Sequence, residues 1–172
     1  MTPPNLIIRD ERTSDHRAIS EVTYAAFEHM ELSNQTEPFI IEALRSAGVL
    51  SISLVAELDG RVVGHIAFSP VTMSDGTQGW YGLGPVSVHP DWQRKGIGKK
   101  LVRRGLARLD QRKAKGCCLV GHPEYYRQFG FENTDRLIHE GVPPQAFFVR
   151  TVDGTIPQGC VTFHEAFQAD GQ

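Results

Sequence analysis

A loop at residues 93–99 holds the residue types best suited to chemistry in this chain, two glycines among basic side chains. A β-type run at residues 86–88 precedes the loop, and a helical pattern begins at Ile97. The first turn of a helix has backbone N–H groups without an intrahelical acceptor, and the helix dipole adds positive potential there. Because Gly96 and Gly98 have no side chains, an anion could approach these N–H groups closely. The pattern predicts a binding site for a phosphate or a diphosphate.

Formal charge at the same loop supports this interpretation, since Arg94, Lys95 and Lys99 flank the glycines. The loop lacks the third glycine of the dinucleotide-binding fingerprint and the Gly-Lys-Ser/Thr of a P-loop. Glycines near a helix start can also simply permit a tight turn, but the preceding strand and the basic run favour anion binding. The predicted cofactor-binding residues are Val86, Ser87, Val88, Gln93, Arg94, Lys95, Gly96, Ile97, Gly98 and Lys99.

The spacing Gln93-x-x-Gly96-x-Gly98 after that strand resembles the acetyl-coenzyme A loop of the GNAT superfamily of N-acetyltransferases. A second segment resembles the family's aromatic-Tyr-x-x-Leu-Gly-Phe motif, with Phe129 where Leu is frequent. It reads Tyr125-Tyr126-Arg127-Gln128-Phe129-Gly130-Phe131.

Two further features support the resemblance. A predicted hairpin from Val55 to Ser69, with Asp59-Gly60 at its tip, stands upstream of the loop as it does in the family. The resemblance covers roughly residues 6–131, and residues 121–131 are similar to a bacterial branch that has Gly-His/Asp-Pro before Tyr-Tyr.

The resemblance implies an α/β (α+β) fold, a single GNAT-like domain over residues 1–172. Its motif-bearing core would span residues 6–131, and strands within residues 146–164 would complete the sheet. The central sheet would be mixed, mostly antiparallel, flanked by helices and splayed between its fourth and fifth strands. Acetyl-CoA would lie in that gap, with the pantetheine paired to the backbone of Val86 and Val88. Its diphosphate would lie on the N–H groups of residues 94–99.

Acetyl transfer to an amine requires a base for the amine proton, a donor for the tetrahedral oxyanion and an acid for the leaving thiolate. The resemblance places a phenol beside the sulfur, so Tyr126 is the predicted acid. The alternative is a core tyrosine, the role that we expect for Tyr125. Backbone N–H groups near Val86 or Val88 are the predicted oxyanion donors.

His122 is the candidate general base, because it follows the strand that borders the gap and an ordinary histidine pKa of about 6.5 suits the task. The alternative is a surface or helix-capping histidine. His65 and Glu57 lie on the hairpin strands and become candidates if they face the substrate, whereas His89 is expected to be exposed. The catalytic Glu of the family's histone-type branch would fall near Gly82, where this chain has no carboxylate.

Hydrophobic periodicity predicts the elements that position these residues. We expect strands at residues 6–8, 51–58, 61–69, 80–88, 117–121, 146–151 and 160–164. We expect helices from Ser14, where Ser14 is the candidate N-cap, and at residues 39–46, 97–115 and 124–130. The helix at residues 97–115 is the strongest, since Ile97, Leu101, Val102, Leu106 and Leu109 recur at helical spacing.

The composition is ordinary for a soluble globular protein, with 40% apolar residues, 22% charged residues and a net charge of -2. This charge argues against a general attraction to nucleic acid or to anionic membranes. The N-terminus lacks the apolar region of a signal peptide, and no apolar run is long enough to cross a bilayer. The three cysteines lack CxxC spacing, so we expect a cytoplasmic protein without a metal or a membrane partner. Oligomerisation stays open.

Ten basic residues and one acid, Asp110, occupy residues 94–115. The first of them would bind the cofactor's phosphates. The others would form a solvated face balanced by acidic neighbours or, alternatively, bind an acidic partner such as nucleic acid; they are Arg103, Arg104, Arg108, Arg112, Lys113 and Lys115.

The predicted function is acetyl transfer from acetyl-CoA to an amine of an unidentified small molecule or protein. The alternative is a catalytically silent acyl-CoA-binding or nucleic-acid-associated regulatory module on the same fold. The presence of Tyr126 favours the enzyme.

Overall fold

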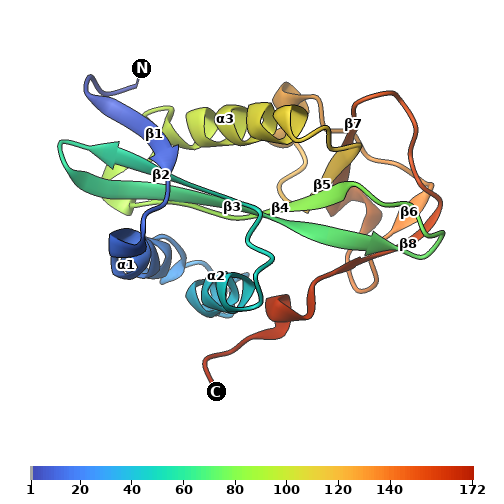
Figure 1. The fold of residues 1–172 in the computed structure, drawn as a ribbon, viewed down its shortest axis with the longest axis horizontal. Helices are drawn as coiled ribbons and strands as arrows, with labels where there is room; N and C mark the ends of the chain where they lie inside the picture. The colour runs from blue at the N-terminus through green and yellow to red at the C-terminus, as the bar shows by residue number, and fades with distance from the viewer. Residues whose placement is uncertain (1) are drawn as a thin grey trace.

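Eight strands form a mixed sheet in the order β1-β2-β3-β4-β5-β7, with β8 beside the far end of β3 and the short β6 beside β8. The computed structural model describes residues 2–172, and Figure 1 shows the sheet as its central layer. All pairs are antiparallel except β4–β5 and β6–β8, which confirms the expected mixed, mostly antiparallel sheet. The strands are β1 (Leu6–Asp10), β2 (Ile52–Leu58), β3 (Arg61–Met73), β4 (Trp80–Val88), β5 (Gly116–Val120), β6 (Leu137–Ile138), β7 (Phe147–Thr151) and β8 (Gly159–Phe163).

The strands β4 and β5 separate after a short parallel contact. They pair from Trp80 opposite Gly116 to Gly82 opposite Cys118. Beyond that point β4 continues along β3 to Val88, while β5 remains paired to β7 on its other side. The expected splay between the fourth and fifth strands is therefore confirmed, and it opens the sheet at its middle.

Helices cover both faces of the sheet. The helix α3 (Ile97–Gln111) packs on one face, and α1 (His16–Phe27) and α2 (Glu37–Ser46) pack on the other (Figure 1). The apolar stripe predicted for α3 faces the sheet, since Ile97, Leu101, Val102, Leu106 and Leu109 are all buried. Within residues 2–172, none of the helices combines the length and the apolar character that crossing a membrane requires.

Several element ends differ from the expectation. The helix α3 ends at Gln111 rather than at residue 115, because the chain turns at Arg112 and Lys113 adopts a left-handed conformation with φ 60°. The strand β3 runs beyond residue 69 to Met73, because its last residues pair with β8. The helix expected at residues 124–130 is a 3-10 turn at Tyr126–Phe129.

The N-cap expected at Ser14 is wrong. Residues Thr13–Asp15 form a 3-10 turn, and α1 begins at His16. The carboxylate of Asp15 holds this turn, because it accepts hydrogen bonds from the Arg12 N–H (2.6 Å) and from the Arg9 guanidinium (2.7 Å). A neighbouring ion pair thus takes the place of the expected hydroxyl cap.

Candidate functional site

The glycine loop joins the end of β4 to the start of α3, as its sequence predicts. Gly96 precedes the helix in the left-handed conformation, with φ 82°, which glycine adopts without steric cost. Arg94 is also left-handed, with φ 64°, which is uncommon for a residue with a side chain. Left-handed residues in such turns direct successive N–H groups to one side, where they form a concave binding site for anions.

Backbone donors are free at the start of α3. The Lys100 N–H donates a hydrogen bond to the Gly96 carbonyl oxygen (3.2 Å). The N–H groups of Ile97, Gly98 and Lys99 precede it and have no intrahelical acceptor. From the other side, Gln93 Nε2 donates to the Val88 carbonyl oxygen at the end of β4 (2.9 Å), which holds the loop in place. The arrangement suits a diphosphate group.

A cavity of about 410 Å³ lies against this loop. All the predicted cofactor-binding residues except Lys95 line it: Val86, Ser87, Val88, Gln93, Arg94, Gly96, Ile97, Gly98 and Lys99. Lys95 is exposed and lies outside the lining. The Ile97 side chain is also part of the buried core. We call this space the loop cavity.

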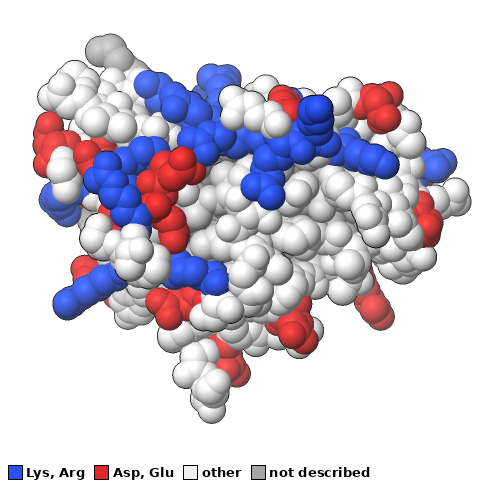
Figure 2. Space-filling view, viewed as in Figure 1, with Lys and Arg blue, Asp and Glu red and all other residues white. Residues whose placement is uncertain are grey.

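Basic side chains form a band along α3, which Figure 2 shows as a blue stripe. Several of them have partners within the protein. Arg103 lies over the Phe129 ring, 5.6 Å from its centroid, and Arg104 Nη1 donates to the Ile8 carbonyl oxygen (3.5 Å). Arg108 forms a two-pronged ion pair with Asp10 (2.8 and 3.0 Å), and Arg112 lies over the Tyr81 ring, 5.7 Å from its centroid. These contacts support the expectation of a solvated face with acidic neighbours, whereas Lys99 lines the loop cavity.

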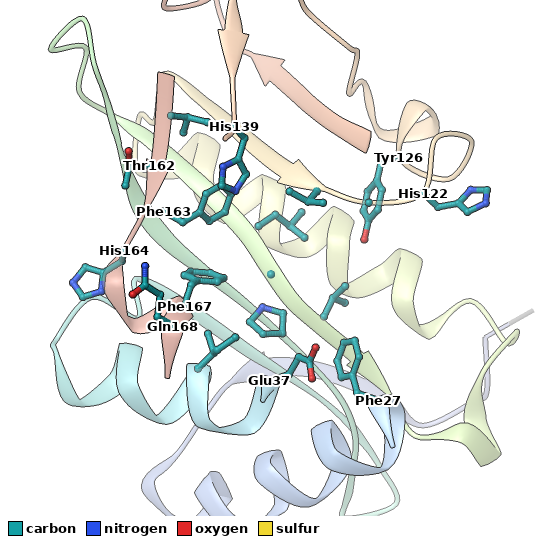
Figure 3. Close-up of a pocket in the computed structure, with 18 of the residues that line it drawn as sticks. Phe27, Glu37, His122, Tyr126, His139, Thr162, Phe163, His164, Phe167 and Gln168 are labelled. Atoms are coloured by element: carbon teal, nitrogen blue, oxygen red, sulfur yellow. The ribbon is translucent and has the colours of Figure 1, made fainter. Parts of the chain in front are cut away.

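A second cavity of about 750 Å³ lies where β4 and β5 separate. One side consists of residues 83–86 of β4, and another consists of Val120 and Gly121 at the end of β5. Residues from α1, α2, β8 and the C-terminal segment complete its walls (Figure 3). Phe27, Met30, Val86 and Tyr125 line both cavities, so the two spaces meet at these side chains. We call the larger space the central cavity.

Tyr126 points its phenol oxygen into the central cavity (Figure 3). The residue is 9% exposed, and its ring packs edge-to-face on Tyr125 and Phe131, with centroids 4.9 and 6.0 Å away. Gly121 makes room for that ring, because a side chain at this position would collide with it. Burial raises the pKa of Tyr126 to about 12, so the phenol keeps its proton at neutral pH.

Tyr125 does not take the core position expected for it. It is partly buried and lines both cavities. Its phenol oxygen lies 3.4 Å from the point that a Cβ atom on Gly98 would occupy. Burial raises the pKa of this phenol as well. Tyr126 is the more buried of the two tyrosines, and Tyr125 is the one beside the glycine loop.

Three histidines line the central cavity. The Nδ1 atoms of His122 and His164 accept hydrogen bonds from backbone N–H groups two residues later (3.4 and 3.0 Å), so both histidines cap turns. In Figure 3 the His122 ring points away from the centre of the cavity. His139 stacks on Phe163 with centroids 4.9 Å apart, and burial lowers its pKa. Within residues 2–172, no three His, Cys, Asp or Glu side chains are grouped as a metal site would require.

The possibility that His65 and Glu57 face the substrate is wrong, because neither residue lines the two cavities. His65 is fully buried, and its Nε2 lies 2.7 Å from the hydroxyl of Ser53, which donates to Glu11. Glu57 accepts a hydrogen bond from Arg9 (2.9 Å). These side chains hold β1, β2 and β3 together.

The protein is expected to lose stability on mild acidification because of His65. Burial lowers the pKa of His65 from 6.5 to about 4, so the unfolded chain binds more protons than the folded chain between these values. The free energy of unfolding therefore falls as the pH drops below 6.5, by roughly 3 kcal/mol once the pH reaches 4. Urea unfolding at pH 7, 5.5 and 4.5 measures this slope. His65→Gln keeps a donor for Ser53 and should lose most of the slope; an unchanged slope would contradict the assignment.

Phe163 of β8 occupies the space beside Gly82. A Cβ atom on Gly82 would lie 2.5 Å from Phe163 Cε2 and 3.2 Å from Val71 Cγ1. A side chain therefore cannot extend from β4 into the central cavity at this position. This position therefore has no carboxylate, and an aromatic ring from a distant part of the chain fills the space beside it.

Glu37 is one of several residues of the central cavity that the sequence analysis missed, together with His139, Glu140 and His164. Glu37 lies in the first turn of α2, and in Figure 3 its carboxylate points into the cavity. The Ser33 hydroxyl lies 2.8 Å from each of its oxygens. A Glu followed by Pro38 is an ordinary helix start in the sequence, so no local signal distinguishes it.

Comparison with known proteins identifies close relatives. Residues 50–133 match the family described as "Acetyltransferase (GNAT) domain". The chain is 32% identical over 128 residues to the "Uncharacterized N-acetyltransferase YhbS" of Escherichia coli K12, which covers 74% of each protein. The crystal structure of Escherichia coli YhbS in complex with CoA matches with a TM-score of 0.88 and 30% identity, covering 99% of this chain and 97% of that one. A GNAT family acetyltransferase from Brucella melitensis, in complex with acetyl-CoA, matches with a TM-score of 0.85 and 48% identity, covering 94% of this chain and 97% of that one.

Proposed function

Because the chain belongs to the GNAT family of acetyltransferases, we propose that it transfers an acetyl group directly from acetyl-CoA to the amine of an acceptor. One observation carries this proposal: the loop cavity and the central cavity meet beside Tyr125, at the point where β4 and β5 separate. A donor bound at the glycine loop and an acceptor bound in the central cavity would thus share one reaction centre.

In this proposal the diphosphate of acetyl-CoA lies on the free N–H groups at the start of α3, beside Arg94 and Lys99. The pantetheine runs along the splayed end of β4 and pairs with the backbone of Val86 and Val88. The Val86 side chain lines both cavities, so the thioester would reach the central cavity there. Two proteins similar to this one hold CoA or acetyl-CoA, which supports binding of this cofactor.

The reaction proceeds through attack of the neutral amine nitrogen on the thioester carbonyl carbon. The C–N bond forms, the C–S bond breaks, and one proton leaves the amine nitrogen. A backbone N–H near Val86 or Val88 stabilises the oxyanion. Tyr126 donates its phenolic hydrogen bond to the sulfur as the thiolate forms. A thiol pKa of about 8.5 lies below the pKa of this phenol, so Tyr126 acts mainly by stabilising the thiolate charge.

His122 is the proposed base for the amine proton. Its Nδ1 accepts the Glu124 N–H (3.4 Å), so the neutral ring carries its proton on Nε2 and Nδ1 is the atom that would accept the amine proton once this hydrogen bond is released. Because the ring points away from the centre of the cavity in Figure 3, the transfer would run through a water molecule or follow a rotation of the side chain. His122→Gln tests this role directly. The variant should lose kcat below neutral pH, and a higher concentration of the amine should not restore it.

Steady-state thiol release from acetyl-CoA, measured across a panel of amines, tests the proposed function. Amine-dependent release of thiol together with formation of an N-acetyl product supports the enzyme. A protein that binds CoA but gives no release with any amine would instead be the silent acyl-CoA-binding module. Any nucleic-acid association on the α3 face would appear separately, as binding that weakens with salt.

CoA is expected to bind more tightly than dephospho-CoA, by about threefold to tenfold, because basic side chains at the start of α3 would reach the 3′-phosphate. Lys99, Lys100 and Arg104 are the candidates, and all three are exposed. The preference should shrink as salt rises, since exposed charges are screened. Calorimetric titration at two salt concentrations measures both effects. Equal affinities for CoA and dephospho-CoA at low salt would mean that these basic side chains do not bind the 3′-phosphate.

A further inference from the structure

The two cavities differ in charge. The loop cavity is lined by Arg94 and Lys99, which suits the phosphates of a donor. Within residues 2–172, the lining of the central cavity contains no Lys or Arg, and it includes the acidic residues Glu37 and Glu140. An acceptor bound there meets negative charge without a compensating cation. This field favours a positively charged amine and disfavours a group that carries a carboxylate or a phosphate.

Glu37 is held in place to receive such a cation. Its oxygens lie within 2.8 Å of the Ser33 hydroxyl, and that hydroxyl in turn accepts the Gln35 N–H (2.9 Å). The side chain is therefore fixed by its own loop, yet within residues 2–172 it has no Lys or Arg partner closer than the ion-pair limit of 4.0 Å. Figure 3 shows the Glu37 carboxylate and the Tyr126 phenol pointing into the same cavity from different walls.

Aromatic rings form another part of the cavity wall. Phe163 and Phe167 pack edge-to-face with centroids 5.1 Å apart, and His139 stacks on Phe163. Phe27 of α1 adds a further ring on the side shared with the loop cavity. Since Phe163 also fills the space beside Gly82, the strand supplies no polar group there. The cavity thus offers one fixed carboxylate and an extended apolar wall.

We propose that the acceptor is a small cationic amine with an apolar or aromatic body and no carboxylate next to the amine, and that Glu37 binds its ammonium group while the Phe163–Phe167 wall packs on its body. This inference rests on the proposed acetyl transfer. The cavity volume of about 750 Å³ lies in the range of small-molecule sites. Glu37 is a specificity-determining residue in this arrangement: it binds the acceptor as the ammonium ion, which loses one proton to solvent water before the neutral nitrogen attacks the thioester as described above.

Three matched amines test the acceptor class: 2-phenylethylamine, phenylalanine and ethylamine. Phenylalanine adds an α-carboxylate to the first compound, and ethylamine removes its ring. We expect kcat/KM for 2-phenylethylamine to exceed that for each of the others by at least tenfold, from the unfavourable carboxylate in one case and the lost apolar contact in the other. Equal or faster turnover of phenylalanine would overturn the charge argument, and equal turnover of ethylamine would overturn the apolar one. If a peptide with a free N-terminus is turned over and none of the small amines is, the acceptor is a protein, and this result would also overturn the proposal.

Glu37→Gln tests the residue itself. We expect KM for 2-phenylethylamine to rise about tenfold, with KM for acetyl-CoA unchanged. Glu42→Gln is the matched control, because Glu42 lies on the same helix, is exposed and is absent from the cavity lining. An unchanged amine KM in Glu37→Gln would refute the assignment.

A binding experiment separates this proposal from the proposed function. Calorimetry of 2-phenylethylamine with the CoA-bound protein reports acceptor binding without turnover, and Glu37→Gln should weaken that binding about tenfold. Binding of 2-phenylethylamine without any thiol release would support the cation site and contradict the proposed acetyl transfer. Thiol release from amines of another class, with no binding of 2-phenylethylamine, would support the proposed acetyl transfer and contradict the proposed acceptor.

Discussion

Replacing Tyr126 by Phe is expected to lower kcat about 100-fold, the usual size of the loss of one hydrogen-bond donor that stabilises developing negative charge. The change removes one oxygen that points into the central cavity and keeps the buried ring packed on Tyr125 and Phe131. The KM for acetyl-CoA and the melting temperature should therefore change little. Initial rates of thiol release at saturating acetyl-CoA and acceptor measure the effect.

Two other tyrosines make the result specific. Tyr24→Phe removes a phenol from an exposed position on α1 outside both cavities, so it should leave the rate unchanged. Tyr125→Phe removes a phenol beside Gly98, so it should raise the KM for acetyl-CoA more than it lowers kcat. A loss of kcat in Tyr125→Phe alone would mean that the roles of the two tyrosines are exchanged. Unchanged rates in both would mean that the thiolate leaves without a phenol.

Gly98→Val should weaken acetyl-CoA binding at least tenfold, which corresponds to about 1.4 kcal/mol. The Cβ atom itself has room, since it would lie 3.4 Å from Tyr125 Oη and 3.8 Å from Val88 Cγ2. The two methyl groups beyond it would extend into the loop cavity, where the diphosphate is proposed to lie. The free N–H groups at the start of α3 would then be shielded from the anion. Calorimetric titration of the folded variant with acetyl-CoA measures the loss.

The matched controls separate lost binding from lost folding. Gly98→Ala adds only the Cβ atom and should give a smaller loss of affinity than Gly98→Val. Ala107→Val adds a β-branched residue to an exposed position of the same helix and should leave affinity unchanged, which isolates the cost of β-branching in α3. If Gly98→Val binds acetyl-CoA as tightly as the wild type while its melting temperature is preserved, the diphosphate does not lie at this loop.

Local pattern was enough to predict the parts of the site that adjoin each other in the chain. The role proposed for the glycine loop depends on its own backbone, since Gly96 and Gly98 have no side chains to block an anion and the helix that follows supplies the N–H donors. The stripe from Ile97 to Leu109 makes that helix pack in one orientation. Because each of these causes acts over one or two turns, residue types and their spacing carry the information. The placement of Tyr126 at the central cavity also follows from a short motif, although its 3-10 turn is shorter than the helix expected there.

The residues brought together from distant segments could not be predicted in the same way. His65 and Glu57 were open candidates by strand alternation, yet His65 is paired with Ser53 and Glu57 with Arg9, because those partners lie on neighbouring strands. Whether a polar side chain faces a cavity or a partner depends on which strand lies beside it, and that is decided by long-range pairing. Tyr125 and Tyr126 also show that local pattern does not predict where a side chain points. They are adjacent in the chain, yet one phenol lies at the glycine loop and the other at the central cavity.

The sequence by itself therefore determined the family, the order of the main elements and the glycine loop before α3, since each depends on neighbours along the chain. Only the tertiary structure decided which groups form the central cavity. Glu37 comes from the start of α2, and Phe163 comes from β8 and fills the space beside Gly82. The physical reason is the separation of β4 from β5, which leaves a space that segments far apart in the chain must line. The charge and shape of that space are properties of the packed molecule.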